Sequence, residues 1–152
     1  MFSTSNTWIK FKSNKRNLFS LYIFLFLFIL SLFAEFISND KPLIMKLDNE
    51  LYIPIIFTYT DKELGGTFET EADYKGYFVT KKISKKDNWA FFPMNPHSYN
   101  SINLNNSTPN PAPPSQYNFL GTDDRGRDVL ARLIYGFRLS VIFALILTAI
   151  GI

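Results

Sequence analysis

Carboxylates and guanidinium groups alternate near the C-terminal end of this 152-residue chain, and they are the side chains most able to do chemistry. Asp123, Asp124 and Asp128 lie close together in this run. A group of carboxylates could bind calcium, but this one lacks the alternating acidic ligands and the terminal glutamate of a calcium-binding loop. Helix capping and ion pairing explain the three residues better. We therefore expect no metal site.

The remaining candidates for catalysis are few. His97 is the only histidine and lies in an expected loop, where we predict a solvated side chain and neither a catalytic triad nor a metal site. The chain has no cysteine, which excludes thiol catalysis and disulfides. It also has no Gly-x4-Gly-Lys-Ser/Thr loop for ATP. We predict no enzyme and no cofactor; in an ATP-driven machine, another subunit would supply the energy.

A helix over residues 119–138 is expected to carry the charged run. Asp128 and Arg132 lie four positions apart, at the spacing of an ion pair on one helix face, with Tyr135 close by. The other face has apolar residues at helical spacing. These residues are Leu130, Leu133, Ile134 and Phe137.

The two ends of this expected helix indicate its surroundings. Thr122 or Asp123 is a suitable N-cap, because a short side-chain oxygen can accept hydrogen bonds from the first turn. At the other end, residues 139–152 begin a second transmembrane helix but are too few to complete a crossing. An amphipathic helix leading into an apolar run is expected to lie along the membrane surface. A surface helix of a soluble domain has the same periodicity.

A first transmembrane helix is expected at residues 18–37. Residues 18–33 carry no charge, and a helix of about 20 residues is about 30 Å long, which matches the hydrocarbon thickness of a bilayer. Residues 1–17 contain four bases and no acid. Because short basic segments stay in the cytoplasm, we place the N-terminus there and residues 38–138 in the periplasm.

Residues 38–118 have the composition of a small exported module of mixed α/β or irregular structure. The aromatic and β-branched runs at 51–57 and 77–80 predict a few short strands or irregular turns, and Pro54 indicates an edge strand or a break. A module of this size buries only a modest core, so we expect its stability to depend on contacts with the membrane part or with a partner. The proline-rich connector at 107–114 is predicted to be a semi-rigid strap.

Two groups of side chains in this module are candidates for surface roles. The basic group is Lys81, Lys82, Lys85 and Lys86. The aromatic group is Trp89, Phe91 and Phe92. We interpret the first as a solvated face, with docking to an acidic partner as the alternative. We interpret the second as a core patch or an interfacial anchor, with a ligand contact as the alternative.

The charged run also resembles a known family. Residues 120–140 read Leu-Gly-Thr-Asp-Asp-Arg-Gly-Arg-Asp-Val-Leu, then Arg-Leu-Ile-Tyr-Gly and Arg-Leu-Ser after one residue each. This run is similar to the signature before the second transmembrane helix in permease subunits of oligopeptide and dipeptide ABC importers. The order and spacing of its glycines, aspartates and arginines make chance a poor explanation. Residues 34–43 and 72–74 resemble the Yej subtype, the microcin C and peptide permease.

This resemblance implies an inner-membrane permease subunit in N-terminal form, mainly α-helical, for peptides or peptide-like compounds such as microcin C. The implied partners are a second permease subunit, ATP-binding cassette ATPase subunits, a periplasmic substrate-binding protein and the lipid bilayer. The pore-lining and ATPase-coupling parts would lie beyond residue 152, so a truncated product is expected. The motif positions implied to have a structural or coupling role are Gly121, Thr122, Asp123, Gly126, Arg127, Asp128, Arg132, Tyr135, Gly136 and Arg138.

One hypothesis concerns the mechanism of this motif. Asp128 with Arg132, aided by Arg127, would fix the expected helix by ion pairing, so that the helix can transmit docking of the binding protein to the second span. Exposed ion pairs contribute only about 0.2–1 kcal/mol, so their role would be to position the helix.

Two other classes of protein fit parts of the sequence. A single-pass, membrane-anchored periplasmic binding or scaffold protein would use residues 38–118 as its functional part. A secreted protein would lose its N-terminal segment, with a cut after Ala34 as the candidate, but Leu32 is a poor fit to the small residue that cleavage needs. Nucleic acid is not an expected partner, because the net charge is only +3 and the bases are scattered.

Overall fold

The computed structural model describes residues 4–103 and 108–151. The chain divides into two compact units. The helical unit contains the chain up to Phe33 and from Phe137 onward, and the module is Ala34–Gly136. Each unit is considered by itself.

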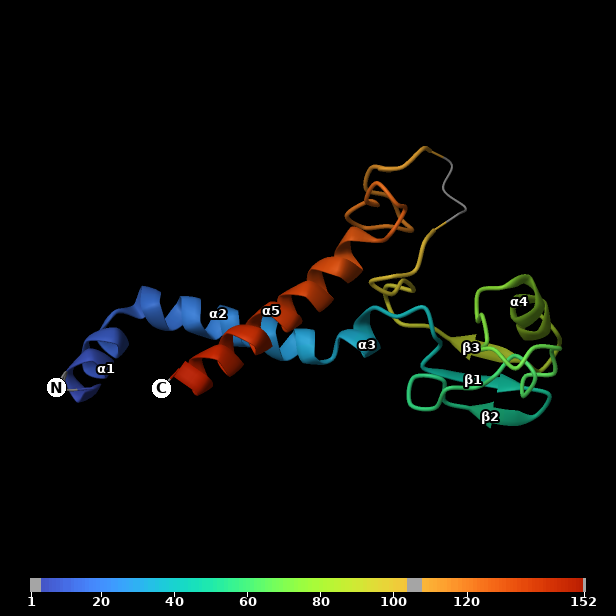
Figure 1. Cartoon of the computed structure of the whole chain (residues 1–152), viewed down its shortest axis with the longest axis horizontal. Coiled ribbons are helices and arrows are strands. Elements are labelled where there is room, and N and C mark those ends of the chain that lie inside the picture. The colour runs from blue at the N-terminus through green and yellow to red at the C-terminus, as the bar shows by residue number, and fades with distance from the viewer. Residues whose placement is uncertain (1–3, 104–107, 152) are drawn as a thin grey trace. The chain divides into compact units, whose positions relative to one another are not determined.

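The helical unit is formed by helices, of which the two long ones are apolar (Figure 1). They are α1 (Thr4–Ser13), α2 (Lys15–Leu32) and the part of α5 (Val129–Gly151) that follows Gly136. In the part of the chain that the structure describes, α2 and α5 are long and apolar enough to cross a membrane. Their 18 and 23 residues correspond to about 27 and about 34 Å of helix. Most of their apolar side chains are exposed within this chain, as expected of helices solvated by lipid.

The expectation of one continuous helix over residues 18–37 is wrong. Helix α2 ends at Leu32, where Phe33 leaves the helical conformation and its N–H turns back to the carbonyls of Leu30 and Ser31. A separate turn of helix, α3 (Ala34–Ile37), then begins the module. The start of α2 also differs, because the Asn14 side chain caps it at Lys15 by accepting the N–H of Arg16 at 3.1 Å.

The module contains a three-stranded antiparallel sheet in the order β2-β1-β3 (Figure 1). Its strands are β1 (Ile44–Leu47), β2 (Glu50–Tyr52) and β3 (Trp89–Phe91). Strands β1 and β2 form a hairpin in which Leu47 pairs with Glu50. The two turn residues between them, Asp48 and Asn49, have φ of 50° and 72°, as a two-residue type I′ turn requires.

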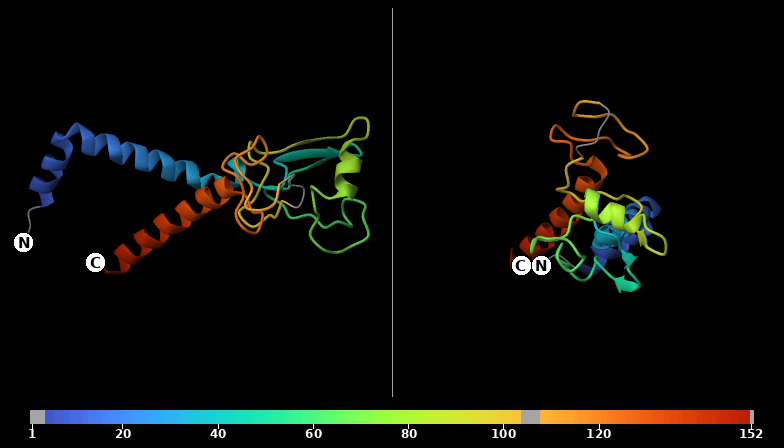
Figure 2. Two further views of the ribbon diagram at one scale, coloured as in Figure 1. Left: turned by 90° about the horizontal axis from the view of Figure 1, so that it is seen from above. Right: turned by 90° about the vertical axis from the view of Figure 1, so that its right-hand side faces the viewer.

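One face of this sheet carries the hydrophobic core of the module. Met45 and Leu47 alternate with exposed residues along β1 and are buried in a cluster with Leu64, Tyr74 and Val79. Val79 comes from α4 (Tyr77–Ile83), which lies beside the sheet (Figure 2). The prediction of a short strand or an irregular turn at residues 77–80 is therefore wrong. Burying Val79 against β1 favours a short helix that begins after Gly76 and outweighs the local β propensity of these residues.

The other face of the sheet carries exposed apolar side chains. Its register places Ile44 opposite Phe91 and Lys46 opposite Trp89. Trp89 is 46% and Phe91 63% exposed, whereas Phe92 packs against the core from the opposite side. The aromatic group is thus divided between the core and an open face, because side chains alternate across a strand.

We expected all four lysines of the basic group to be solvated, but one of them, Lys82, is largely buried. Lys82 has only 16% of its side chain exposed, forms an ion pair of 2.8 Å with Asp48 and donates to the carbonyl of Leu64 at 2.7 Å. These contacts tie α4 to the hairpin turn and to the core loop. Lys82 is therefore a structural residue, while Lys86 is exposed.

We predict that Lys82→Met lowers the local stability of the module by about 1–3 kcal/mol, because it leaves the Asp48 carboxylate and the Leu64 carbonyl without their donor. Hydrogen–deuterium exchange in β1, measured on the whole chain in detergent micelles, reports this change. The matched control Lys86→Met should alter protection by no more than about 0.5 kcal/mol. Equal protection in both variants would contradict the role of Lys82.

Candidate functional site

The charged run is folded differently from the helix expected at residues 119–138. Helix α5 begins only at Val129 and continues without a break to Gly151. Before it, the chain forms a compact loop in which Thr122 pairs with Asp128 and Ile102 pairs with Arg127 as isolated bridges. The separate interfacial helix and the N-cap at Thr122 or Asp123 are therefore corrected: the helix cap is Asp128, whose Oδ1 accepts the N–H of Ala131 at 2.7 Å.

Two glycines of the motif make this loop possible. Gly121 and Gly126 have φ of 78° and 79°, a left-handed conformation that favours glycine. A Cβ on Gly121 would lie 2.4 Å from the carbonyl oxygen of Ala112, and one on Gly126 would lie 2.6 Å from the side-chain nitrogen of Asn110. Both glycines are thus required by backbone conformation and by close approach of the connector.

Thr122 attaches the connector to this loop. Its N–H donates to the carbonyl of Ala112 at 3.0 Å, and its Oγ1 accepts the N–H of Ala112 at 2.9 Å. The same hydroxyl donates to Oδ1 of Asn110 at 2.8 Å. The predicted strap is therefore attached to the motif at Asn110 and Ala112, and its first residue, 107, lies outside the described residues.

Asp123 forms the ion pairs that we assigned to Asp128. Its carboxylate binds the guanidinium groups of Arg127, at 2.7 Å, and of Arg132. It also accepts the backbone N–H groups of Arg125 and Arg127, each at 2.9 Å. Partial burial alone would raise the pKa of Asp123, but these hydrogen bonds outweigh burial and hold the pKa well below its ordinary value of 3.8.

Asp128 is buried and makes its contacts with uncharged donors. Only 1% of the residue is exposed. Its Oδ1 accepts the amide of Asn95 at 2.8 Å as well as the N–H of Ala131, and its Oδ2 accepts the amide of Asn118 at 2.8 Å. Asp128 therefore has donors at both oxygens and lies at the N-terminal end of α5, where the helix dipole favours negative charge.

We define the Asp128 cluster as Asp128, Asn95, Asn118 and Ser38, all of which are buried. Asn95 donates to both Asp128 and Ser38, the latter at 3.0 Å, so its amide joins the start of α5 to the end of α3. The backbone adds to this link, because Asn95 donates to the carbonyl of Ile37 and accepts the N–H of Asn39.

A second link between the same two helices comes from Tyr135. Its hydroxyl donates to the carbonyl of Ser38 at 3.0 Å, and its ring lies 5.0 Å from that of Tyr99. The place where the chain enters the module and the place where it leaves are thus held together by side chains from four separate segments. This arrangement can set a fixed spacing between the two places.

The motif residues that remain lie farther along α5. Gly136 has open space where a Cβ would project, and Arg138 is partly exposed. Neither belongs to the Asp128 cluster. The sequence analysis missed Asn95, Asn118 and Ser38 as functional residues, although Ser38 lies within the stretch 34–43 that resembles the Yej subtype.

His97 also differs from the solvated residue that we expected. It is only 8% exposed, and its backbone carbonyl accepts the Ser38 hydroxyl at 2.7 Å. Burial lowers the pKa of His97, and the nearby positive charge of Lys75 lowers it further. In the described residues, no group of three or more histidines, cysteines or carboxylates could hold a metal ion.

We predict that Asp123→Asn destabilises the module by about 1–3 kcal/mol at neutral pH, because the two guanidinium groups lose a charged acceptor. The pKa of Asp123 is lower in the folded chain, so its stabilisation is present above about pH 4 and is lost as the pH falls through the folded value. The difference between wild type and variant in urea unfolding should therefore shrink in acid. A difference that stays constant down to low pH would contradict this assignment.

Sequence comparisons give a consistent affiliation. Residues 4–54 match the family described as the N-terminal TM domain of oligopeptide transport permease C. The chain is 42% identical over 141 residues to "Inner membrane ABC transporter permease protein YejE" of Escherichia coli (strain K12), covering 93% of this chain and 41% of that protein. It is 37% identical over 172 aligned positions to "Peptidoglycan transport system permease protein YejE" of Agrobacterium fabrum (strain C58), covering 96% of this chain and 44% of that protein.

No solved structure matches the chain. The chain spans less than half the length of the curated relatives that it matches. These relatives are transport proteins of a membrane, which agrees with the two apolar helices α2 and α5. The chain belongs to the Yej-like permeases of oligopeptide-type ABC transporters.

Proposed function

We propose that this chain is the N-terminal part of an inner-membrane permease subunit of an ABC importer for peptides or peptide-like compounds such as microcin C. The family membership and the two apolar helices support the location in the inner membrane. The observation that carries the structural part of the proposal is the Asp128 cluster, which joins the end of α3 to the start of α5.

In this proposal, α2 and α5 cross the membrane and the module lies in the periplasm. The bases before and at the start of α2 favour a cytoplasmic N-terminus, since Lys10, Lys12, Lys15 and Arg16 have no acidic counterpart there. The module has its own hydrophobic core and carries exposed charged side chains such as Lys62, Glu69 and Lys86, as expected of a part that lies in water.

The proposed role of the module is to hold the two spans at a set spacing on the periplasmic side. Two hydrogen-bonded connections support this role: Asn95 between Ser38 and Asp128, and Tyr135 to the Ser38 carbonyl. The Asn95 side-chain oxygen is buried without a hydrogen-bond partner, but both hydrogen bonds of its amide nitrogen are made. Breaking either of them would leave a further buried polar group unsatisfied, which makes these connections costly to break. A displacement of the module, such as one caused by a docking partner, would therefore move α3 and the start of α5 together.

The partners in this proposal are those of an ABC importer: a second permease subunit, ATP-binding cassette ATPase subunits and a periplasmic substrate-binding protein. The module would face the binding protein. Transport also requires the parts of the subunit that lie outside the matched two fifths of the relatives.

We predict that Asp128→Asn abolishes most peptide uptake when residues 4–151 replace the matching region of the Escherichia coli relative. The asparagine amide would direct an N–H₂ group toward the amide donors of Asn95 or Asn118, at a cost of about 3 kcal/mol. Uptake of a labelled tripeptide and hydrogen exchange at α3 report the two consequences. The exposed neighbour provides the control, Asp124→Asn, which should retain both uptake and protection. Normal uptake by Asp128→Asn would reject the proposed role of the Asp128 cluster in holding the two spans at a set spacing, which we call the bracing role.

We predict that the module lies in the periplasm and the N-terminus in the cytoplasm. Labelling of single introduced cysteines tests this topology, because the chain has no cysteine of its own that would be labelled. In spheroplasts, a membrane-impermeant maleimide should label Thr67→Cys, on the exposed surface of the module, and should label Ser13→Cys only after permeabilisation. Labelling of both sites in intact spheroplasts would contradict the proposed crossing. Release of a mature chain into the medium would favour the secreted alternative.

A further inference from the structure

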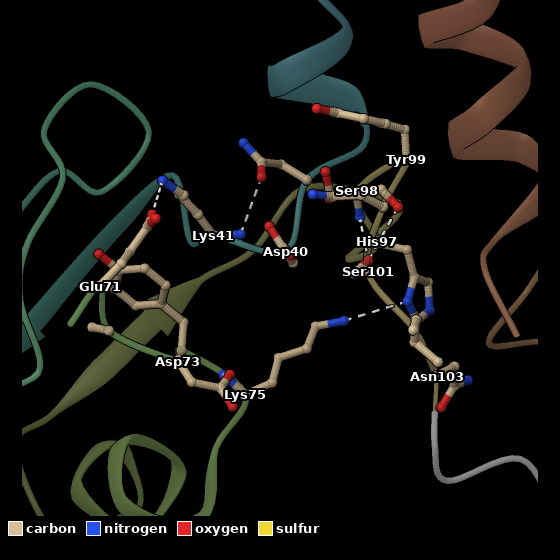
Figure 3. Close-up of a pocket in the computed structure, with 15 residues that line it drawn as sticks. Asp40, Lys41, Glu71, Asp73, Lys75, His97, Ser98, Tyr99, Ser101 and Asn103 are labelled. Carbon is tan, nitrogen blue, oxygen red and sulfur yellow. Dashed lines mark hydrogen bonds and ion pairs between the residues drawn. The ribbon is translucent and has the colours of Figure 1, made fainter. Parts of the chain in front are cut away.

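The module contains a cavity that the bracing role does not use. Its volume is about 710 Å³, and its walls come from residues 39–41, 71–75 and 97–103. Most of the side chains that line it are polar or charged (Figure 3). A volume of this size lies within the range of small-molecule sites.

Lys75 supplies a positive charge to this cavity. Figure 3 shows its side chain reaching across the opening to His97, where its Nζ lies 3.4 Å from Nδ1. The other ring nitrogen of His97 lies 3.0 Å from the carbonyl oxygen of Tyr117, which can only accept, so the ring proton is on Nε2 and Nδ1 accepts from Lys75. Among the described residues, Lys75 has no ion-pair partner.

Asp40 supplies a negative charge to the same cavity. No hydrogen bond or ion pair to its carboxylate is found within the described part of the chain. Its charge is nevertheless felt by the Lys75 ammonium: burial lowers the pKa of Lys75, while Asp40, Asp73 and Asp128 raise it. Of the other charges, Lys41 pairs with Glu71. The Asp73 carboxylate accepts the backbone N–H of Lys75 at 3.0 Å but has no cationic partner among the described residues, so it adds a second negative charge near Lys75.

A cavity that presents one unpaired cation, Lys75, and a carboxylate with no hydrogen bond of its own, Asp40, is complementary to a zwitterion. A simple anion would be repelled by Asp40, and a simple cation by Lys75. Neutral groups at the wall, including Ser98, Tyr99 and Asn100, can donate to or accept from amide groups between the two charged ends. The ligand that matches this combination has an ammonium, a carboxylate and peptide groups between them.

We propose that this cavity binds a short zwitterionic peptide, with its α-ammonium group at Asp40 and its α-carboxylate at Lys75. The identification as a peptide rests on the proposed transport function; the two charged contacts rest on the cavity itself. His97 is a positioning residue, because its Nδ1 holds the Lys75 ammonium at the wall. The module thereby offers a transient station for the substrate beside its brace.

The test is calorimetric titration of the whole chain in lipid nanodiscs with trialanine, N-acetyl-trialanine and trialanine amide. Wild type should bind trialanine, and blocking either end should weaken binding about tenfold or more, the loss expected for one charged hydrogen bond. Asp40→Asn should bind the free and acetylated peptides equally and still discriminate against the amide. Lys75→Gln should show the reverse pattern.

Matched controls are Asp124→Asn and Lys86→Gln, which change the same charges on the exposed surface and should bind as wild type does. Hydrogen exchange in β1 verifies that each variant is folded. Equal binding of free and blocked peptides, no binding at millimolar concentration, or identical patterns for Asp40→Asn and Lys75→Gln would each overturn the site. If the chain does not bind the peptide but the grafted importer takes up peptide normally, the cavity site is rejected and the transport function is retained. If the chain binds the peptide but the grafted importer takes up none, the transport function alone is contradicted.

Discussion

The burial of one carboxylate is the constraint on which the module depends. Asp128 is placed where water cannot reach it, so each of its oxygens must find a donor inside the protein. The donors come from Asn95, Asn118 and the first turn of α5. Because these groups belong to segments far apart in the sequence, satisfying a single side chain determines where several loops must lie.

Asp123 and Asp128 have different kinds of partner because they differ in solvent exposure. Asp123 lies nearer the surface and is compensated by two arginines, which also remain in contact with water. Asp128 is compensated by neutral amides, which bring no second charge into the interior. A charged partner for Asp128 would have added its own desolvation cost. The loop turns made by Gly121 and Gly126 allow the two aspartates to occupy these different environments.

The same network connects the two proposed activities of the module. Ser38 and His97 are linked by the bond from the Ser38 hydroxyl to the His97 carbonyl, and the His97 ring contacts Lys75 at the cavity. The brace and the cavity therefore share a wall. Occupation of the cavity by a charged ligand would act on residues that also hold α3, which gives a direct physical route from ligand to helix position.

The sequence by itself determined the features that depend on local composition. The long apolar runs that became α2 and α5, the absence of thiol chemistry and the family affiliation could all be read from residue types and spacing. The ion pair assigned to Asp128 and Arg132 could not, because Asp128 precedes α5 as its cap and its carboxylate accepts hydrogen bonds from Asn95 and Asn118 inside the module, while Arg132 binds Asp123. Only the tertiary structure decided that Asp128 is buried, that Asn95 reaches both Ser38 and Asp128, and that Tyr77–Ile83 is helical. These features arise from contacts between distant segments, whose free energy outweighs local propensity and leaves no periodic signal in the chain.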